Sequence, residues 1–155
     1  MKNLMEFSLM NNNLSPTLLE WLALNEYQAD NLDSQGGYGN TALMKASREG
    51  RDDLVKELID AGASLKRMNI DGNTALWLSC FSNNIICTQL LIDAGINLDT
   101  QNVNGVTSLM YAASSGKDAF VKLLLDSGAD KTITNDDDFT ALDFACTRNI
   151  VNFLR

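Results

Sequence analysis

The chain has 155 residues and carries 20 acidic against 12 basic side chains, a formal net charge of −8, so its length is that of one domain. With an isoelectric point near 4.3, nucleic acid and anionic membrane are poor candidates for the main partner, because phosphate contacts need clustered lysine and arginine. Histidine is absent, which removes the commonest general base and metal ligand.

The first 30 residues are rich in leucine and aromatic side chains, and they contain one clear helix signal. Ser15 followed by Pro16 is typical of an N-cap and a proline in the first helical turn. We expect a capping function for the apolar side chains that follow, which are Leu18, Leu19, Trp21, Leu22 and Leu24. The opening residues do not resemble a signal peptide, since an acidic residue interrupts a short apolar run. No run reaches the ~18 apolar residues of a membrane-spanning helix, so a cytoplasmic protein is expected.

A pattern with a constant spacing of 33 residues follows this segment. Its most regular element is a threonine, a small residue and a leucine, and it starts at Thr41, Thr74, Thr107 and Thr140. Glycine stands two residues before the first three of these threonines, at Gly39, Gly72 and Gly105. A fixed period between about 20 and 50 residues indicates a stack of repeated units rather than a globular enzyme fold.

Each unit is expected to contain two helices joined by a tight turn. The threonine is placed as an N-cap, whose hydroxyl accepts a hydrogen bond from an otherwise unpaired amide. The second helix of the first full unit carries an apolar stripe of Leu54, Val55, Leu58 and Ile59. Gly62 follows as a left-handed helix terminator. Close approach of neighbouring helices is expected where a small residue recurs, at Ala46, Ser79, Ala112 and Ala145.

Over residues 31–155 the pattern resembles the ankyrin repeat, which has a turn glycine, T-x-L, a small pair, a mid-repeat glycine and L-L-x-x-G-A. The resemblance implies an all-α solenoid of helix-turn-helix units with projecting β-hairpin-like loops. It divides the single domain 1–155 into an N-terminal capping repeat 1–35, full repeats 36–68, 69–101 and 102–134, and a truncated C-terminal capping repeat 135–155.

The sequence departs from the family pattern at two kinds of position. The place of the family histidine is taken by Met44, Trp77, Met110 and Asp143, so the polar tie that histidine makes to neighbouring loops must be weaker or replaced. Asn83 and Asn149 stand where the other units have Gly50 and Gly116. Because asparagine tolerates a positive φ better than most residues, we expect it to preserve the turn between the two helices.

No pattern of catalytic residues is found, and we predict no enzyme activity, no cofactor and no metal site. The sequence lacks a P-loop, a G-x-G-x-x-G segment and a nucleophile elbow. Its three cysteines have no C-x-x-C spacing and are expected to be reduced and largely packed, with Cys80 partly exposed. The run Asp136-Asp137-Asp138 is placed at a loop tip, where a solvated acidic turn is a better interpretation than a cation site.

By resemblance, the function is that of a non-enzymatic adaptor that binds another protein through the loop tips and the concave face of the first helices. The register selects a set of candidate contact residues: Tyr38, Asn40, Arg48, Ile70, Asn73, Trp77, Phe81, Val103, Val106, Met110, Ser114 and Phe139. Trp77 and Phe81 are four residues apart and therefore on one helical face. With the methionines they are expected to form an aromatic–methionine patch, although packing is an alternative role for Trp77 and Met110.

An alternative function is that of an inhibitor or immunity-type protein that blocks a target enzyme. The acidic charge would then steer the chain toward a basic target. Nucleic acid and membrane are not expected as partners. The unbound protein is expected to be a monomer because both ends look capped, although a clipped last unit would leave Leu142, Phe144 and Phe153 partly exposed.

Overall fold

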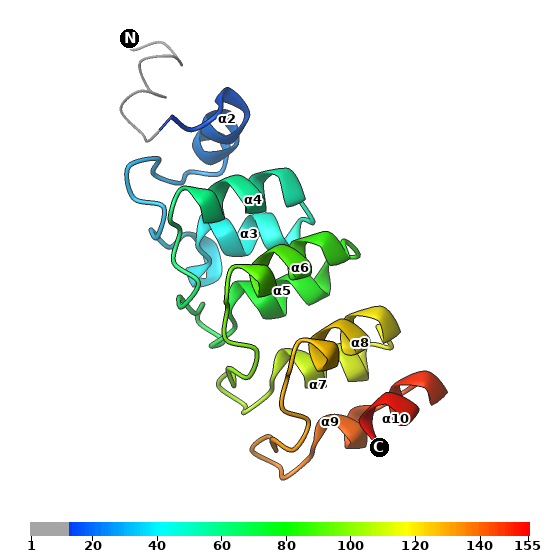
Figure 1. Ribbon diagram of the computed structural model, residues 1–155. Coiled ribbons are helices and arrows are strands. Elements are labelled where there is room, and N and C mark those ends of the chain that lie inside the picture. The colour runs from blue at the N-terminus through cyan, green and yellow to red at the C-terminus, as the bar shows by residue number, and fades with distance from the viewer. Residues whose placement is uncertain (1–12) are drawn as a thin grey trace.

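The computed structural model describes residues 13–155, and between these residues it contains helices and turns but no β-strand. The described part of the chain begins with α2 (Pro16–Leu24) and a short 3₁₀ turn, η1 (Gly37–Gly39). Four helix pairs follow: α3 (Ala42–Arg48) with α4 (Asp52–Asp60), α5 (Ala75–Phe81) with α6 (Ile85–Asp93), α7 (Ser108–Ser114) with α8 (Asp118–Asp126), and α9 (Ala141–Phe144) with α10 (Arg148–Leu154). The pairs stack into an elongated solenoid whose connecting loops project from one side (Figure 1), which confirms the predicted all-α repeat architecture.

The four threonines of the repeat pattern occupy the N-cap positions of the first helices, as predicted, although the Thr74 hydroxyl does not accept the expected hydrogen bond. The Thr41 hydroxyl accepts a hydrogen bond from the Met44 amide, and the Thr41 amide in turn donates to the Met44 thioether sulfur at 3.4 Å. Thr107 makes the same pair of bonds in the third unit. In the last unit the Asp143 carboxylate accepts from the Thr140 amide at 2.7 Å. Met44, Met110 and Asp143 therefore make a local polar tie at the helix start in the place of the family histidine, whereas Trp77 makes none.

The core consists of leucines interleaved with the predicted small residues. Ala46, Ser79 and Ala112 are wholly buried, so adjacent first helices pack closely at these positions. Ala145, the fourth member of the series, is only half-buried because α9 ends one residue before it. Each unit buries its helices against its neighbours, so the stability of the solenoid is a sum of nearest-neighbour contacts.

The prediction for Asn83 is wrong, because this residue does not adopt the left-handed backbone that Gly50 has at φ 71°. Helix α5 instead ends at Phe81, and Ser82 continues as extended chain. The Lys117 ammonium of the next unit donates to the backbone carbonyls of residues 80–82. A side chain from the neighbouring unit thus supplies the hydrogen bonds that the glycine turn supplies elsewhere.

The prediction for Asn149 is also wrong, since this residue lies in the first turn of α10 and not in the turn between helices. Thr147 is the N-cap of α10, and the helix starts earlier in the repeat register than α8 does. The Thr147 hydroxyl and the Asn149 amide donate to the two oxygens of Asp118, at 2.8 and 2.9 Å. These bonds attach the last helix to α8, and the early start of α10 leaves α9 with four residues.

The loops between units form tight hairpin turns that are bonded to one another, as the β-hairpin-like loops of the prediction require. Each turn is closed by a bond from the amide of one residue to the carbonyl four positions later, as in Asn69 to Asn73. Neighbouring turns are joined by backbone bonds from Ile70 to Tyr38, from Val103 to Asp71 and from Asp136 to Asn104. The loop tips are therefore one continuous hydrogen-bonded row.

The ends of the described chain agree with most of the capping predictions. Leu18, Leu19, Trp21 and Leu22 are buried, whereas Leu24 is 84% exposed because α2 ends there and its side chain faces solvent. The part of the predicted cap in residues 1–12 lies outside the described residues. At the other end Leu142 and Phe153 are exposed and Phe144 is half-buried, as predicted. The repeat boundaries stay a prediction, since the helix pairs do not decide to which unit a hairpin belongs.

Alanine substitutions at two glycines that share a left-handed backbone test how closely the hairpins stack. A Cβ at Gly72 (φ 75°) would lie 2.9 Å from the Val103 amide nitrogen, whereas one at Gly62 (φ 91°) would meet nothing within 4 Å. We expect Gly62→Ala to cost about 1 kcal/mol for the backbone strain alone, and Gly72→Ala to cost clearly more because two backbones collide. Urea unfolding followed by circular dichroism measures both. Equal losses would contradict tight stacking of the hairpins.

Candidate functional site

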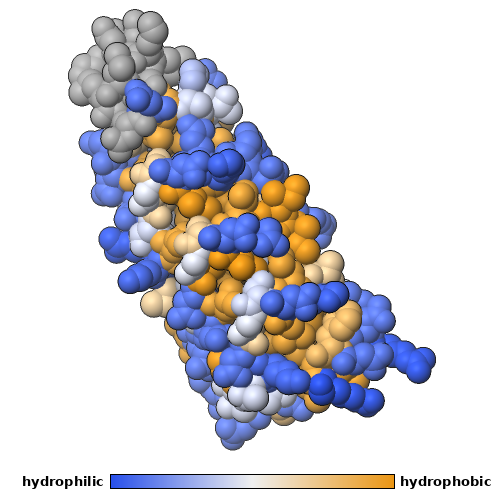
Figure 2. Space-filling view, viewed as in Figure 1, coloured by the Kyte–Doolittle hydropathy of each residue, from blue (hydrophilic) through white to orange (hydrophobic). Residues whose placement is uncertain are grey.

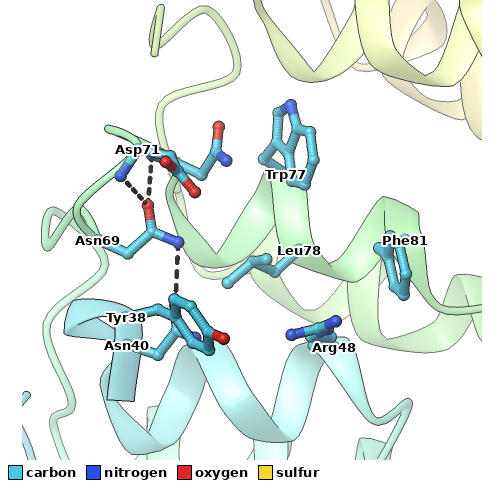
Figure 3. A pocket seen from close by; sticks show the side chains of 9 residues that line it. Tyr38, Asn40, Arg48, Asn69, Asp71, Trp77, Leu78 and Phe81 are labelled. Atoms are coloured by element: carbon cyan, nitrogen blue, oxygen red, sulfur yellow. Dashed lines mark hydrogen bonds between the residues drawn. The ribbon is translucent and has the colours of Figure 1, made fainter. Parts of the chain in front are cut away.

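Two open hollows lie side by side between the loop tips and the first helices of the first two full units. The first has a volume of roughly 400 Å³ and is lined by Tyr38, Asn40, Arg48, Asn69, Asp71, Asn73, Trp77, Leu78 and Phe81 (Figure 3). The second has a volume of roughly 460 Å³ and is lined by Asn25, Tyr27, Gly37, Tyr38, Asn40, Lys45, Arg48, Glu49 and Phe81. We call the two hollows together the groove.

Arg48 and Phe81 border both hollows and contact each other. They occupy the same register position in consecutive units, on α3 and α5, and the guanidinium carbon lies 5.0 Å from the centre of the Phe81 ring. Phe81 is 48% exposed. A cation over an aromatic face at this distance is attracted by the ring quadrupole, so the pair holds an exposed ring and a charge in a fixed relation.

Tyr38 forms the third side of this junction and is the most exposed aromatic residue of the groove, at 73%. It lies in η1 with a left-handed backbone, φ 58° and ψ 17°, which is uncommon for a residue other than glycine. Its carbonyl accepts the amide of Ile70 from the next hairpin. The hairpin row therefore fixes the backbone that presents the phenol ring at the rim.

Trp77 has a packing contact and also lines the first hollow. Its position is therefore compatible with both roles that the sequence left open, packing and contact with a partner. Its ring lies 4.2 Å from that of Tyr111, with 35° between the planes, and the side chain is half-buried. The indole Nε1 is buried and has no hydrogen-bond partner among residues 13–155. Leu78, which also lines the first hollow from α5, was missed by the selection from sequence (Figure 3).

The predicted aromatic–methionine patch is wrong with respect to the methionines. Met110 is 1% exposed and belongs to the core, and Met44 is buried to the same extent. Both side chains fold back to place their sulfur atoms against the threonine N-caps, which removes them from the surface. Val106 is half-buried and packs against the core.

Asn40 and Asn73 were also selected as contacts, but their side chains are buried and used internally. The Asn40 side-chain oxygen accepts from the Asn69 amide at 3.0 Å, and that of Asn73 accepts from the Asn102 amide at 3.1 Å. Each bond joins two hairpins, so the two asparagines act as structural ties. Both also line the first hollow, and their part in binding stays a prediction.

The other predicted contacts are exposed but lie outside the groove. Ile70 and Val103 project from neighbouring hairpin tips, and Ser114 lies at the end of α7. Phe139 is exposed on the last hairpin, where its ring packs edge-to-face against Phe144 at 5.9 Å. Their part in binding stays a prediction.

Lys45 and Leu78 line the groove and were missed. They lie one turn before Arg48 and Phe81 on the same helices. Applying the repeat register to that preceding turn as well would have identified them. Leu78 was missed because the same position holds a lysine in the unit before, so no common residue type marked it.

The thiols of Cys80 and Cys87 are poor nucleophiles in this fold, whereas Cys146 is exposed and departs from the expected packing. Cys80 and Cys87 are buried, so the expectation that Cys80 is partly exposed is wrong. Burial raises the pKa of Cys80 to about 12, and burial with the nearby charges of Asp52 and Asp53 raises the pKa of Cys87 to about 11. A reactive cysteine needs a lowered pKa. Among the described residues, no group of three or more acidic or cysteine side chains is placed to hold a metal ion.

A second apolar surface lies on the second helices and was not predicted. It is a shallow hollow of roughly 280 Å³ lined by Ile85, Ile86, Gln89, Leu90 and Leu123. Figure 2 shows apolar residues gathered over the middle of the face on which Figure 1 places α6. Ile86 is 54% exposed, and the corresponding residue of α4 is Asp53.

Comparison with known proteins agrees with the repeat geometry. The family model for ankyrin repeats in three copies matches residues 4–102 and 87–155. The DNA replication inhibitor plutonium of Drosophila melanogaster is 38% identical over 55 residues, which are 36% of this chain and 32% of that protein, so the likeness covers about a third of the relative. No helix in the described part of the chain is both long and apolar enough to cross a membrane. Because the family model matches most of the sequence, the chain belongs to the ankyrin repeat family, whose members are generally non-enzymatic protein–protein interaction modules.

Proposed function

We propose that this protein is an adaptor that binds a partner protein through the groove and the adjoining loop tips. The observation that carries the proposal is the exposed Phe81 ring beside Arg48, with a hollow on either side of the pair. The same position holds Ser114 and Thr147 in the following units, so the fold itself does not require an aromatic side chain there.

The composition of the groove supports binding to a protein. Aromatic residues and arginine are enriched among the few interface residues that carry most of the binding energy. Tyr38, Trp77, Phe81 and Arg48 are gathered within one groove. Fully burying an exposed phenylalanine side chain is worth about 1.5–3 kcal/mol, and Phe81, which is 48% exposed, would contribute roughly half of that on binding.

The loop tips support the same proposal because they are held in place before a partner arrives. Ile70 and Val103 are exposed apolar side chains whose amides donate to the preceding hairpin at 3.0 Å. A surface whose backbone is already ordered loses less conformational entropy on binding than a free loop does. We therefore include these two side chains in the proposed contact surface.

An inhibitor that blocks a target enzyme is the second candidate function, and one observation favours it. The relative from Drosophila melanogaster bears the name of a DNA replication inhibitor. An inhibitor of a basic target would use the net charge of −8 to accelerate its encounter with that target.

Capture from a lysate of the source organism tests the placement of the site. Phe81→Ala is expected to remove the specifically bound protein, through a loss of about 2 kcal/mol or roughly 30-fold in affinity. Ile86→Ala, which truncates an equally exposed side chain on the opposite helix of the same unit, is the matched control. Mass spectrometry identifies the retained proteins, and circular dichroism verifies that both variants fold. Loss with Ile86→Ala but not with Phe81→Ala would exclude the groove as the binding site.

The salt dependence of the association rate separates the two candidate functions. An adaptor held by an apolar and aromatic groove should associate with the captured partner at nearly the same rate between about 50 and about 500 mM salt, a range over which salt increasingly screens exposed charges. An acidic inhibitor steered to a basic enzyme should associate at least about 10-fold more slowly at the higher salt concentration. Stopped-flow fluorescence of the groove tryptophan, Trp77, can report the rate.

A further inference from the structure

We propose that the groove receives a partner segment in which a carboxylate side chain lies beside a large apolar side chain. This inference rests on the proposed function, since it assumes that the partner occupies the groove, and it adds the chemistry of that partner.

The two hollows have different linings although they share Arg48 and Phe81. The first has Trp77, Leu78 and the Phe81 ring on the side of α5, where they can pack against an apolar group, and polar residues of the hairpins on its other side. The second is bordered by Lys45 and Arg48, with Glu49 as its acidic residue. One hollow therefore fits an apolar side chain, and the adjoining one carries two cations against one anion.

Arg48 is free to bind a carboxylate. The ion pairs among residues 13–155 are Arg51 with Asp53, Lys56 with Asp60 and Lys122 with Asp126, so neither Arg48 nor Lys45 is paired there. The Arg48 guanidinium carbon lies over the Phe81 ring, 5.0 Å from its centre. The N–H donors of this guanidinium take part in none of the ion pairs among residues 13–155, so they are available for a bidentate bond to a carboxylate.

The cations are confined to one end of the groove, which gives the bound segment a direction. The position of Arg48 holds Phe81 and Ser114 in the next two units, and that of Lys45 holds Leu78 and Tyr111. A partner carboxylate is thus held at α3, and the apolar side chain next to it lies toward α5 and α7. Elsewhere the chain is strongly acidic and repels carboxylates, which favours this single register.

A phage-displayed library of random 12-residue peptides tests the proposal without knowledge of the natural partner. Peptides are selected on the wild-type protein and counter-selected on folded Phe81→Ala. We expect the survivors to share an aspartate or glutamate next to a leucine or an aromatic residue. For a synthetic peptide of this group, Arg48→Gln should weaken binding about 10-fold, whereas Arg51→Gln, which removes the same charge outside the groove, should leave the affinity unchanged.

Charge reversal supplies a second, independent readout. Arg48→Glu should bind the same peptide poorly and regain affinity when the aspartate or glutamate of the peptide is replaced by lysine. Groove-dependent peptides without an acidic residue, or an affinity unaffected by Arg48→Gln, would overturn this inference and leave the proposed function standing. A failure to obtain any peptide that depends on Phe81 would overturn it as well. The lysate capture with Phe81→Ala then decides separately whether the groove binds a protein.

Discussion

The structure depends on the contact between each unit and the next, because no helix pair can bury both of its faces alone. The contact has two parts, the close packing of first helices at Ala46, Ser79 and Ala112 and the row of backbone bonds along the hairpins. Glycine at the hairpin turns is needed for the second part, since a Cβ at Gly105 would lie 2.8 Å from the backbone of the next hairpin. Asp138 can take the corresponding place, with φ 64°, on the last hairpin of the chain.

The same contact creates the groove and fixes its rim. The carbonyl of Tyr38 accepts from Ile70, and Asn40 is tied to Asn69 through its side chain. These bonds hold the exposed ring of Tyr38 over the first helices, where Arg48 and Phe81 meet. A stable scaffold thus supplies exposed side chains in fixed positions, which is the physical basis of the proposal that the groove binds a protein.

The sequence predicted the parts of this structure that repeat and failed where single residues change the local geometry. Period and residue type located the N-cap threonines, the turn glycines and the exposed positions of Tyr38 and Phe81. The period could not reveal that Lys117 would replace the glycine turn at residue 83, because this bond joins side chain and backbone in different units. The period also could not show whether the side chains of Asn40 and Met110 point into the core or toward solvent, because either direction is compatible with the same repeat spacing.

Site-specific photo-crosslinking in cells tests most directly the central claim that the groove is the partner-binding surface. A benzophenone amino acid replaces Phe81 in one variant and Ile86, on the apolar surface of α6, in another. If the groove binds the partner, a discrete crosslinked protein should form from position 81 and none from position 86. Adducts formed from position 86 alone would contradict it and would assign binding to the second helices.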